Sequence, residues 1–150
     1  MNPSAIQLCD ETDCESLDAL LAARIYEFNV SATGYADGRL LGGRVRDDTG
    51  AVVAGFSGHT WGGCCVLTHL WVHASHRRRG LGRTLLRAAE TEARRRGCAQ
   101  VVLATHSFQA SGFYEREGYV KQAVIRDNPR GYADILYAKP LHPEGVTCPH

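Results

Sequence analysis

A basic turn punctuated by glycines lies near the middle of the chain, at Arg77-Arg78-Arg79-Gly80-Leu81-Gly82-Arg83. Guanidinium groups donate forked hydrogen bonds that suit phosphate oxygens. Gly80 and Gly82 let the backbone approach such an oxygen, because no Cβ blocks the way. If a helix begins here, its first N–H groups have no intrahelical partner and its dipole favours negative charge. The residue types therefore predict a site for a pyrophosphate.

The segments on either side of this turn must position it. Residues 64–72 form the dense apolar run of a buried strand, and residues 73–76 connect that strand to the turn. After the turn the apolar spacing becomes helical, and Gly97 is placed to end the helix behind Arg94–Arg96. The face predicted to be buried carries Leu81, Leu85, Ala88, Ala89 and Ala93. A strand thus leads through an anion-binding turn into a helix.

This strand–turn–helix segment resembles the GNAT superfamily of acetyl-CoA-dependent N-acetyltransferases. Members carry Arg/Gln-x-x-Gly-x-Gly/Ala between the fourth strand and the next helix, and Arg77-x-x-Gly80-x-Gly82 matches this motif in place and context. Members also carry Asn-x-x-Ala-x-x-aromatic-Tyr-x-x-x-Gly-Phe/Tyr downstream. The residues that match the second motif are Ala110, Phe113, Tyr114, Gly118 and Tyr119. The resemblance covers about residues 5–140.

The resemblance implies an α/β (α+β) architecture with the GNAT fold. We expect a mixed, mostly antiparallel sheet of six to seven strands, with helices on both faces. A central bulge is expected to split the sheet between Val72 and the strand at Val101. We expect a single domain over residues 1–150, with its core at about residues 5–140 and a loose tail at residues 141–150.

Local patterns predict the remaining elements. Ala5–Leu8 is a short apolar segment expected to form a first strand, and a helix is expected from Asp10–Asp13 to about residue 28. Asn29–Gly38 is rich in Gly, Ser, Thr and Asn and is expected to be a loop or a short irregular helix. The other expected strands are residues 39–46, 52–59, 98–104, 120–125 and 133–138.

The resemblance implies acetyl-CoA as the acyl-donor cosubstrate and implies no metal. Backbone groups of Leu70, Trp71 and Val72 are expected to pair with the pantetheine amides. The residues expected around the pyrophosphate are Arg77, Arg78, Arg79, Gly80, Leu81, Gly82, Arg83 and Thr84. Ser107 stands where the family usually has an asparagine that binds the cofactor arm, and Gln109 is the alternative.

Acetyl transfer to an amine requires a neutral amine, a stabilised oxyanion and a proton for the leaving thiolate. The resemblance assigns the proton donor to Tyr114. With a reference pKa of about 10, a phenol is protonated at neutral pH. The sequence does not identify the general base. His69, His59, His106, Glu27 and a chain of water molecules are alternatives, and each of these side chains also has a structural interpretation.

The acceptor is expected on the acidic part of the chain. Residues 1–60 hold nine acidic and four basic side chains, whereas residues 61–150 hold seven and thirteen. Solvated surface charges would give the same imbalance. In the family, the region from the first helix to the second strand forms one wall of the acceptor pocket. The substrate-side candidates are Glu27, Phe28, Asn29, Tyr35 and, on the central strand, His69.

The predicted function is therefore acetyl transfer from acetyl-CoA to a primary amine of a small cationic molecule, such as an aminoglycoside-type antibiotic or a polyamine-like metabolite. The alternatives are an acetyltransferase for amino acids, peptides or protein lysines, and a non-catalytic acyl-CoA-binding sensor. The acceptor, the acyl chain length and the oligomeric state are not predicted. GNAT proteins often dimerise through their last strands, which is compatible with a homodimer.

Composition narrows the remaining functional classes. With 150 residues and a formal net charge of +1, the chain is expected to fold as one globular domain. No apolar run approaches the ~18 residues that span a bilayer, and the N-terminus lacks signal-peptide features, so we expect a cytoplasmic protein without membrane partners. The arginine clusters lack interleaved aromatic residues, which argues against nucleic acid. The six cysteines show no metal-ligand spacing and are expected to be buried thiols.

Overall fold

The computed structural model describes residues 5–142, which divide into one unit ending at Ala36 and a second unit beginning at Asp37. The first unit is the helix α1 (Glu11–Thr33). Asp10 caps it, because its Oδ1 accepts a hydrogen bond from the Asp13 N–H at 2.9 Å. Gly34, with φ of 77°, ends the helix by donating its N–H to the Val30 carbonyl.

Two predictions for this unit were wrong. Ala5–Leu8 is not a strand, because a short apolar segment forms one only where another strand offers a ladder. The helix does not end at about residue 28 but extends to Thr33, so the first half of the segment 29–38 continues α1. The composition of that segment suggested a loop, but the glycine that ends the helix comes only at position 34.

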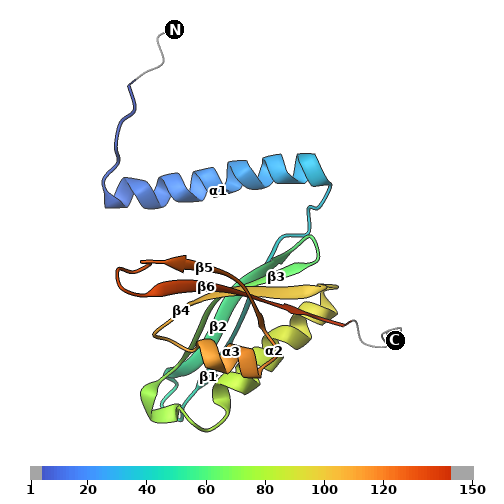
Figure 1. Cartoon of the computed structure of the whole chain (residues 1–150). Coiled ribbons are helices and arrows are strands. Elements are labelled where there is room, and N and C mark those ends of the chain that lie inside the picture. The colour runs from blue at the N-terminus through green and yellow to red at the C-terminus, as the bar shows by residue number, and fades with distance from the viewer. Residues whose placement is uncertain (1–4, 143–150) are drawn as a thin grey trace. The chain divides into compact units, whose positions relative to one another are not determined.

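The second unit is a six-stranded mixed sheet with two α-helices (Figure 1). Its strands lie in the order β1-β2-β3-β4-β6-β5, with β3 and β4 parallel and the other neighbours antiparallel. The strands are β1 (Arg39–Arg46), β2 (Val52–Trp61), β3 (Cys64–Val72), β4 (Gln100–His106), β5 (Val120–Arg126) and β6 (Ala133–Pro140). The helices are the short 3₁₀ turn η1 (Ala74–His76), α2 (Leu81–Arg95) and α3 (Ser111–Arg116). This confirms the predicted mixed, mostly antiparallel fold.

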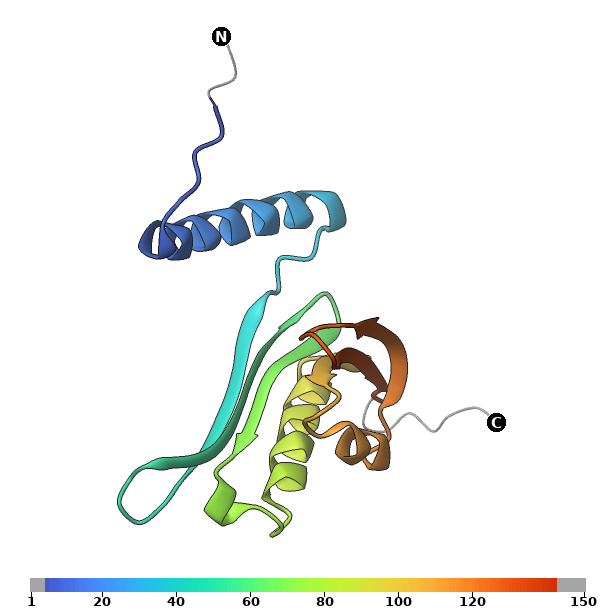
Figure 2. The same cartoon turned by 60° about the vertical axis from the view of Figure 1, so that its left-hand side comes forward.

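The helix α2 runs alongside β1, β2 and β3, as Figure 2 shows, and closes the core of this unit. Its buried side chains are Leu85, Leu86, Ala89, Glu90 and Ala93. Ala88, predicted to be buried, is exposed, since the apolar face is centred on Leu86 and Ala89. Among the cysteines, Cys65 and Cys98 are buried as expected, but Cys9 and Cys14 are exposed free thiols.

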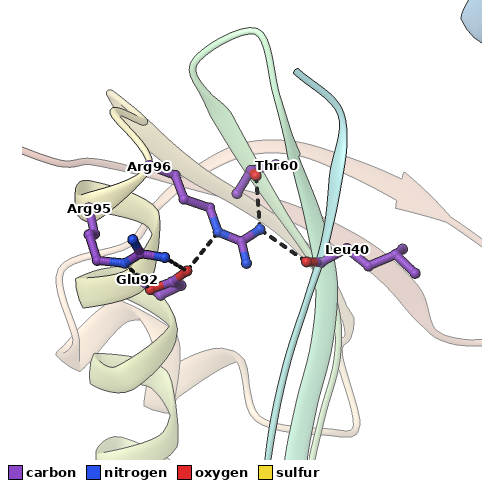
Figure 3. Close-up of polar contacts among 5 residues, drawn as sticks. All are labelled: Leu40, Thr60, Glu92, Arg95 and Arg96. Carbon is purple, nitrogen blue, oxygen red and sulfur yellow. Dashed lines mark hydrogen bonds and ion pairs between the residues drawn. The ribbon is translucent and has the colours of Figure 1, made fainter. Parts of the chain in front are cut away.

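One arginine joins the C-terminal end of α2 to β1 and β2 (Figure 3). The Arg96 side chain donates to Glu92 Oε1 at 2.8 Å, to the Leu40 carbonyl at 3.0 Å and to Thr60 Oγ1 at 3.1 Å. Arg95 donates two further hydrogen bonds to the same Glu92 carboxylate. The arginine cluster that follows α2 therefore fixes the helix on β1 and β2.

The sheet opens in its middle. β3 and β4 pair only from Cys64–Leu67 against Gln100–Leu103. On the other side of β3, Ser57 faces His69 and Gly58 faces Leu67, so Thr68 is an extra residue in β3. A Cβ on Gly58 would lie 2.1 Å from the Val66 carbonyl oxygen, so only glycine allows this approach. The bulge bends β3 away from β4 and creates the predicted split.

Candidate active site

The turn between β3 and α2 has the backbone of an anion site. Arg78 and Gly80 have positive φ angles of 62° and 76°. The first amide of the helical ladder is that of Thr84, which donates to the Gly80 carbonyl at 3.0 Å. The N–H groups of Leu81, Gly82 and Arg83 therefore lie ahead of the ladder and point out of the N-terminus of α2. Arg77 stays close to the strand because its Nε donates to the Val72 carbonyl at 3.0 Å.

A cavity of about 830 Å³ extends from this turn into the split. One part of its wall comes from Leu70 and Leu103 on the core face of the sheet and from Tyr114 of α3. His69, Trp71 and Ala104 also line it, and they alternate with core residues along β3 and β4. Because successive strand side chains face opposite sides, the cavity is bounded by residues of both faces of the sheet.

Most of the predicted cofactor residues meet at this cavity. Those that line it are Leu70, Trp71, Val72, Arg77, Arg78, Gly80, Leu81, Gly82, Arg83 and Gln109. Tyr114 and His69 line it as well. Arg79, Thr84 and Ser107 do not belong to its lining. The remaining substrate-side candidates, Glu27, Phe28, Asn29 and Tyr35, belong to the other unit of the chain.

The space around Gly82 tests whether this turn fits a pyrophosphate. A Cβ on Gly82 would lie 3.7 Å from Phe113 Cζ and 3.9 Å from Val72 Cγ2, which are ordinary contacts. Packing within the chain therefore does not require glycine at this position. A missing side chain at a helix N-terminus beside Arg77, Arg78 and Arg83 is instead what close approach of a phosphate needs. The turn fits the phosphates of a CoA-type cofactor.

Tyr114 is held in the cavity wall by aromatic packing. Its ring contacts the rings of Phe113, Tyr119 and Tyr137, with centroids 5.1, 5.7 and 6.2 Å away. Tyr119 is fixed in turn, because its hydroxyl donates to the buried Glu90 carboxylate at 3.0 Å. Burial raises the pKa of Tyr114 above its ordinary value. The phenol therefore stays protonated at neutral pH.

Two further predicted residues have defined local partners. The Ser107 hydroxyl accepts a hydrogen bond from the Ala133 N–H at 3.1 Å, so this side chain joins the end of β4 to the start of β6. Gln109 Oε1 accepts from Thr105 Oγ1 at 3.1 Å and from the His106 N–H at 2.9 Å, which leaves its amide NH₂ as the available donor. On β3, His69 Nδ1 lies 3.1 Å from Ser57 Oγ.

Sequence reasoning missed other residues of the cavity wall. Phe108 and Arg116 line the cavity, one in the loop after β4 and the other on α3. Arg116 adds a fourth guanidinium to those of Arg77, Arg78 and Arg83. An aromatic residue directly after a strand was the available signal for Phe108, whereas nothing local distinguished Arg116.

Within residues 5–142, no group of three or more His, Cys, Asp and Glu side chains is arranged to hold a metal ion. Among the helices of the same part of the chain, none is long and apolar enough to span a bilayer.

Comparison with known proteins defines the class of this site. The profile of the acetyltransferase (GNAT) family matches residues 6–119. The chain is 39% identical over 95 residues to blasticidin-S acetyltransferase of Streptomyces morookaense, covering 63% of this chain and 70% of that protein. It is 34% identical over 114 residues to an acetyltransferase of Agrobacterium fabrum, covering 76% and 82%.

Solved structures share the fold. An acetyltransferase from Bacillus cereus superposes with a TM-score of 0.78 at 26% identity, covering 94% of this chain and all of that one. An aminoglycoside 6'-N-acetyltransferase in complex with coenzyme A gives a TM-score of 0.63 at 20% identity, covering 74% and 76%. The chain belongs to the GNAT acetyltransferase family. It is an N-acetyltransferase, and its family uses acetyl-CoA.

Proposed function

We propose that the protein transfers the acetyl group of acetyl-CoA directly to a primary amine of a small cationic molecule of the antibiotic type. The observation that carries this proposal is the cavity that extends from the turn into the split of the sheet, with four arginines and Tyr114 in its wall. A donor bound at the turn and an acceptor entering through the split can meet inside one cavity. This arrangement supports a ternary complex.

In this proposal the turn holds the phosphates. The N–H groups of Leu81, Gly82 and Arg83 and the guanidinium groups of Arg77 and Arg78 bind them. Beyond Leu67, β3 no longer pairs with β4, so the polar backbone groups of Leu70 to Val72 that face the split are available to the pantetheine arm. Acetyl-CoA supplies a thioester: the amine nitrogen forms a bond to its carbonyl carbon, and the carbon–sulfur bond breaks.

Tyr114 acts on the departing sulfur. Burial holds the Tyr114 pKa above the ~10 of an ordinary phenol, whereas a thiol such as that of cysteine has a reference pKa of about 8.5. Complete transfer of the phenolic proton to a thiolate is therefore uphill. We infer that Tyr114 stabilises the developing thiolate mainly by hydrogen-bond donation and passes its proton only as solvent replaces it. The proton lost by the amine leaves to solvent or to a base that stays unassigned.

The acceptor class rests on likeness to proteins with named substrates. One relative is named for blasticidin S and one structural neighbour for aminoglycosides. Both names support an antibiotic as acceptor. We further propose that residues 1–150 act as one domain and that the protein is cytoplasmic. If the protein forms a homodimer, we propose that the last strands form the interface.

The test is a direct assay of product. Purified protein is incubated with acetyl-CoA and, in turn, blasticidin S, an aminoglycoside, spermidine, free amino acids and a lysine peptide, and the N-acetylated product is detected by mass spectrometry. Product detection avoids the background that the protein's own cysteines would give with a thiol reagent. We expect turnover with an antibiotic. Turnover with the lysine peptide alone would replace this proposal by protein acetylation, and CoA binding without any turnover would favour a sensor.

A further inference from the structure

The side chains of Phe108 and Tyr132, next to the cavity, are largely exposed to solvent, and the proposed acetyl transfer gives them no role. Phe108 is 55% exposed and Tyr132 is 54% exposed. Their ring centroids are 4.9 Å apart with planes at 74°, and the His106 ring stacks on Phe108 at 5.3 Å and 14°. We name His106, Phe108 and Tyr132 the aromatic platform. Exposed aromatic rings grouped in this way are typical of binding surfaces.

The backbone on which the platform stands is fixed from both sides. The Ser107 N–H donates to the Ala133 carbonyl at 2.8 Å, and the Ala133 N–H donates to Ser107 Oγ at 3.1 Å. Gln109 closes the turn after β4, because its N–H donates to the His106 carbonyl at 2.9 Å. These bonds join the loop after β4 to the loop before β6. The backbone that carries the rings is therefore pre-organised, and a ligand would not have to order it.

The platform borders the cavity on the face of the sheet opposite α2. Phe108 itself lines the cavity. His106 pairs with Asp134 across β4 and β6, and both alternate with buried residues, namely Thr105 and Ile135. Their side chains therefore point away from the core. Ala104, on the same face of β4, is also part of the cavity wall. A molecule entering the split from this face would pass the platform.

Asp134 provides a negative charge at this position. Its side chain is 25% exposed, and its Oδ1 lies 3.7 Å from His106 Nδ1, beyond hydrogen-bond distance. That nitrogen is buried and makes no hydrogen bond to any residue from 5 to 142. The carboxylate thus keeps its capacity to accept a hydrogen bond from an ammonium or amidinium group. The faces of Phe108 and Tyr132 also attract cations. The arginines of the cavity favour anions, so the two ends favour opposite charges.

We propose that the aromatic platform and Asp134 bind the acceptor, and that this acceptor is an organic cation with a planar ring. The ring packs against Phe108 and Tyr132, a cationic group pairs with Asp134, and the primary amine reaches into the cavity. This proposal rests on the proposed function, because it assigns the acceptor end of the same site. It restricts the proposed class of acceptor from small cations in general to cations that contain a planar ring.

A matched pair of diamines tests the proposal. The probes are 1,4-bis(aminomethyl)benzene and 1,4-bis(aminomethyl)cyclohexane, which have the same charge and similar length and differ in the planar ring. Their dissociation constants are measured by calorimetry, with and without CoA. We expect the wild type to prefer the benzene diamine at least about fivefold. Phe108→Ala should reduce this preference to about one, and Asp134→Asn should weaken both diamines about tenfold.

Val120→Ala is the matched control, since Val120 is 60% exposed on β5 and lies outside the platform. This variant should keep the preference. Equal affinity of the wild type for the two diamines, absence of binding, or a preference that survives in Phe108→Ala would overturn the proposal. A Phe108→Ala or Asp134→Asn variant that also lost thermal stability would point to a structural role and overturn it as well. Failure of the proposed function is seen separately, as an absence of CoA binding and of acetylated product from every amine.

Discussion

The two ends of α2 carry similar arginine clusters and use them in opposite ways. At the C-terminal end, the Arg96 side chain is 11% exposed and is committed to Glu92, Thr60 and the Leu40 carbonyl. At the N-terminal end, Arg77, Arg78 and Arg79 are exposed beside N–H groups that precede the helical ladder. The charge at the C-terminal end has internal acceptors and anchors the helix. At the N-terminal end, Arg77 donates to the Val72 carbonyl, but Arg78 and Arg79 lie beside backbone donors that precede the helical ladder, which is the arrangement that we propose for phosphate binding.

The largest effect is expected on CoA affinity, from substitution of Gly82 at the N-terminal end of α2. Gly82→Asp should weaken CoA binding by about 100-fold or more, because it places bulk and negative charge against the phosphates. Gly82→Ala, which the family motif allows at this position, is the matched control and should change the affinity little. The added Cβ fits the fold, and alanine is the better helix former, so the Tm of Gly82→Ala should be unchanged or higher. Calorimetric titration with CoA and thermal unfolding measure the two effects. Retained affinity in Gly82→Asp would place the phosphate site elsewhere.

The second-largest effect is expected from substitution of Tyr114, which should change the rate of the reaction and not the binding of the phosphates. Tyr114→Phe should lower kcat by well over about tenfold while the dissociation constant for CoA stays the same. The aromatic packing with Phe113, Tyr119 and Tyr137 is kept, so the Tm should change little. Tyr119→Phe is the control for loss of a neighbouring hydroxyl, and it should act on stability through Glu90 instead. Unchanged kcat in Tyr114→Phe would remove this residue from the mechanism.

Arg96 tests the structural end of the helix. Arg96→Ala should destabilise the fold by about 2 kcal/mol, because it leaves the buried Thr60 hydroxyl and the Leu40 carbonyl without their donor. Urea unfolding measures this change, and CoA affinity should be unaffected. Arg78→Ala is the matched variant at the other end, since Arg78 is exposed and has a positive φ. It should weaken CoA binding severalfold without loss of stability. The comparison fails if the two variants behave alike.

The same contrast shows what the sequence could and could not predict. The strand, turn and helix around Arg77–Gly82 follow from local signals, namely apolar spacing, glycine positions and the switch of period. The role of Arg96 does not, because its acceptor at Leu40 lies 56 residues away. The platform is of the same kind: Phe108 and Tyr132 meet only through the pairing of β4 with β6. Ser107 was predicted as a cofactor contact by its place in the motif, yet its hydroxyl bonds to Ala133.

The smallest effect is expected from substitution of Glu92, which should lower the Tm in a pH-dependent way and leave CoA affinity unchanged. The hydrogen bonds from Arg95 and Arg96 lower the pKa of the Glu92 carboxyl from 4.5 to about 2. A carboxyl whose pKa is lower in the folded state stabilises the fold fully above about pH 4.5 and loses this contribution as the pH falls toward 2. Glu92→Gln should therefore lower the Tm by about 2–3 °C at pH 7, and its difference from the wild type should shrink between pH 4.5 and pH 3. CoA affinity at pH 7 should be the same in both proteins, because Glu92 serves the end of α2 that holds the fold. A Tm difference that was undiminished at pH 3 would mean that Glu92 acts through packing and not through its charge.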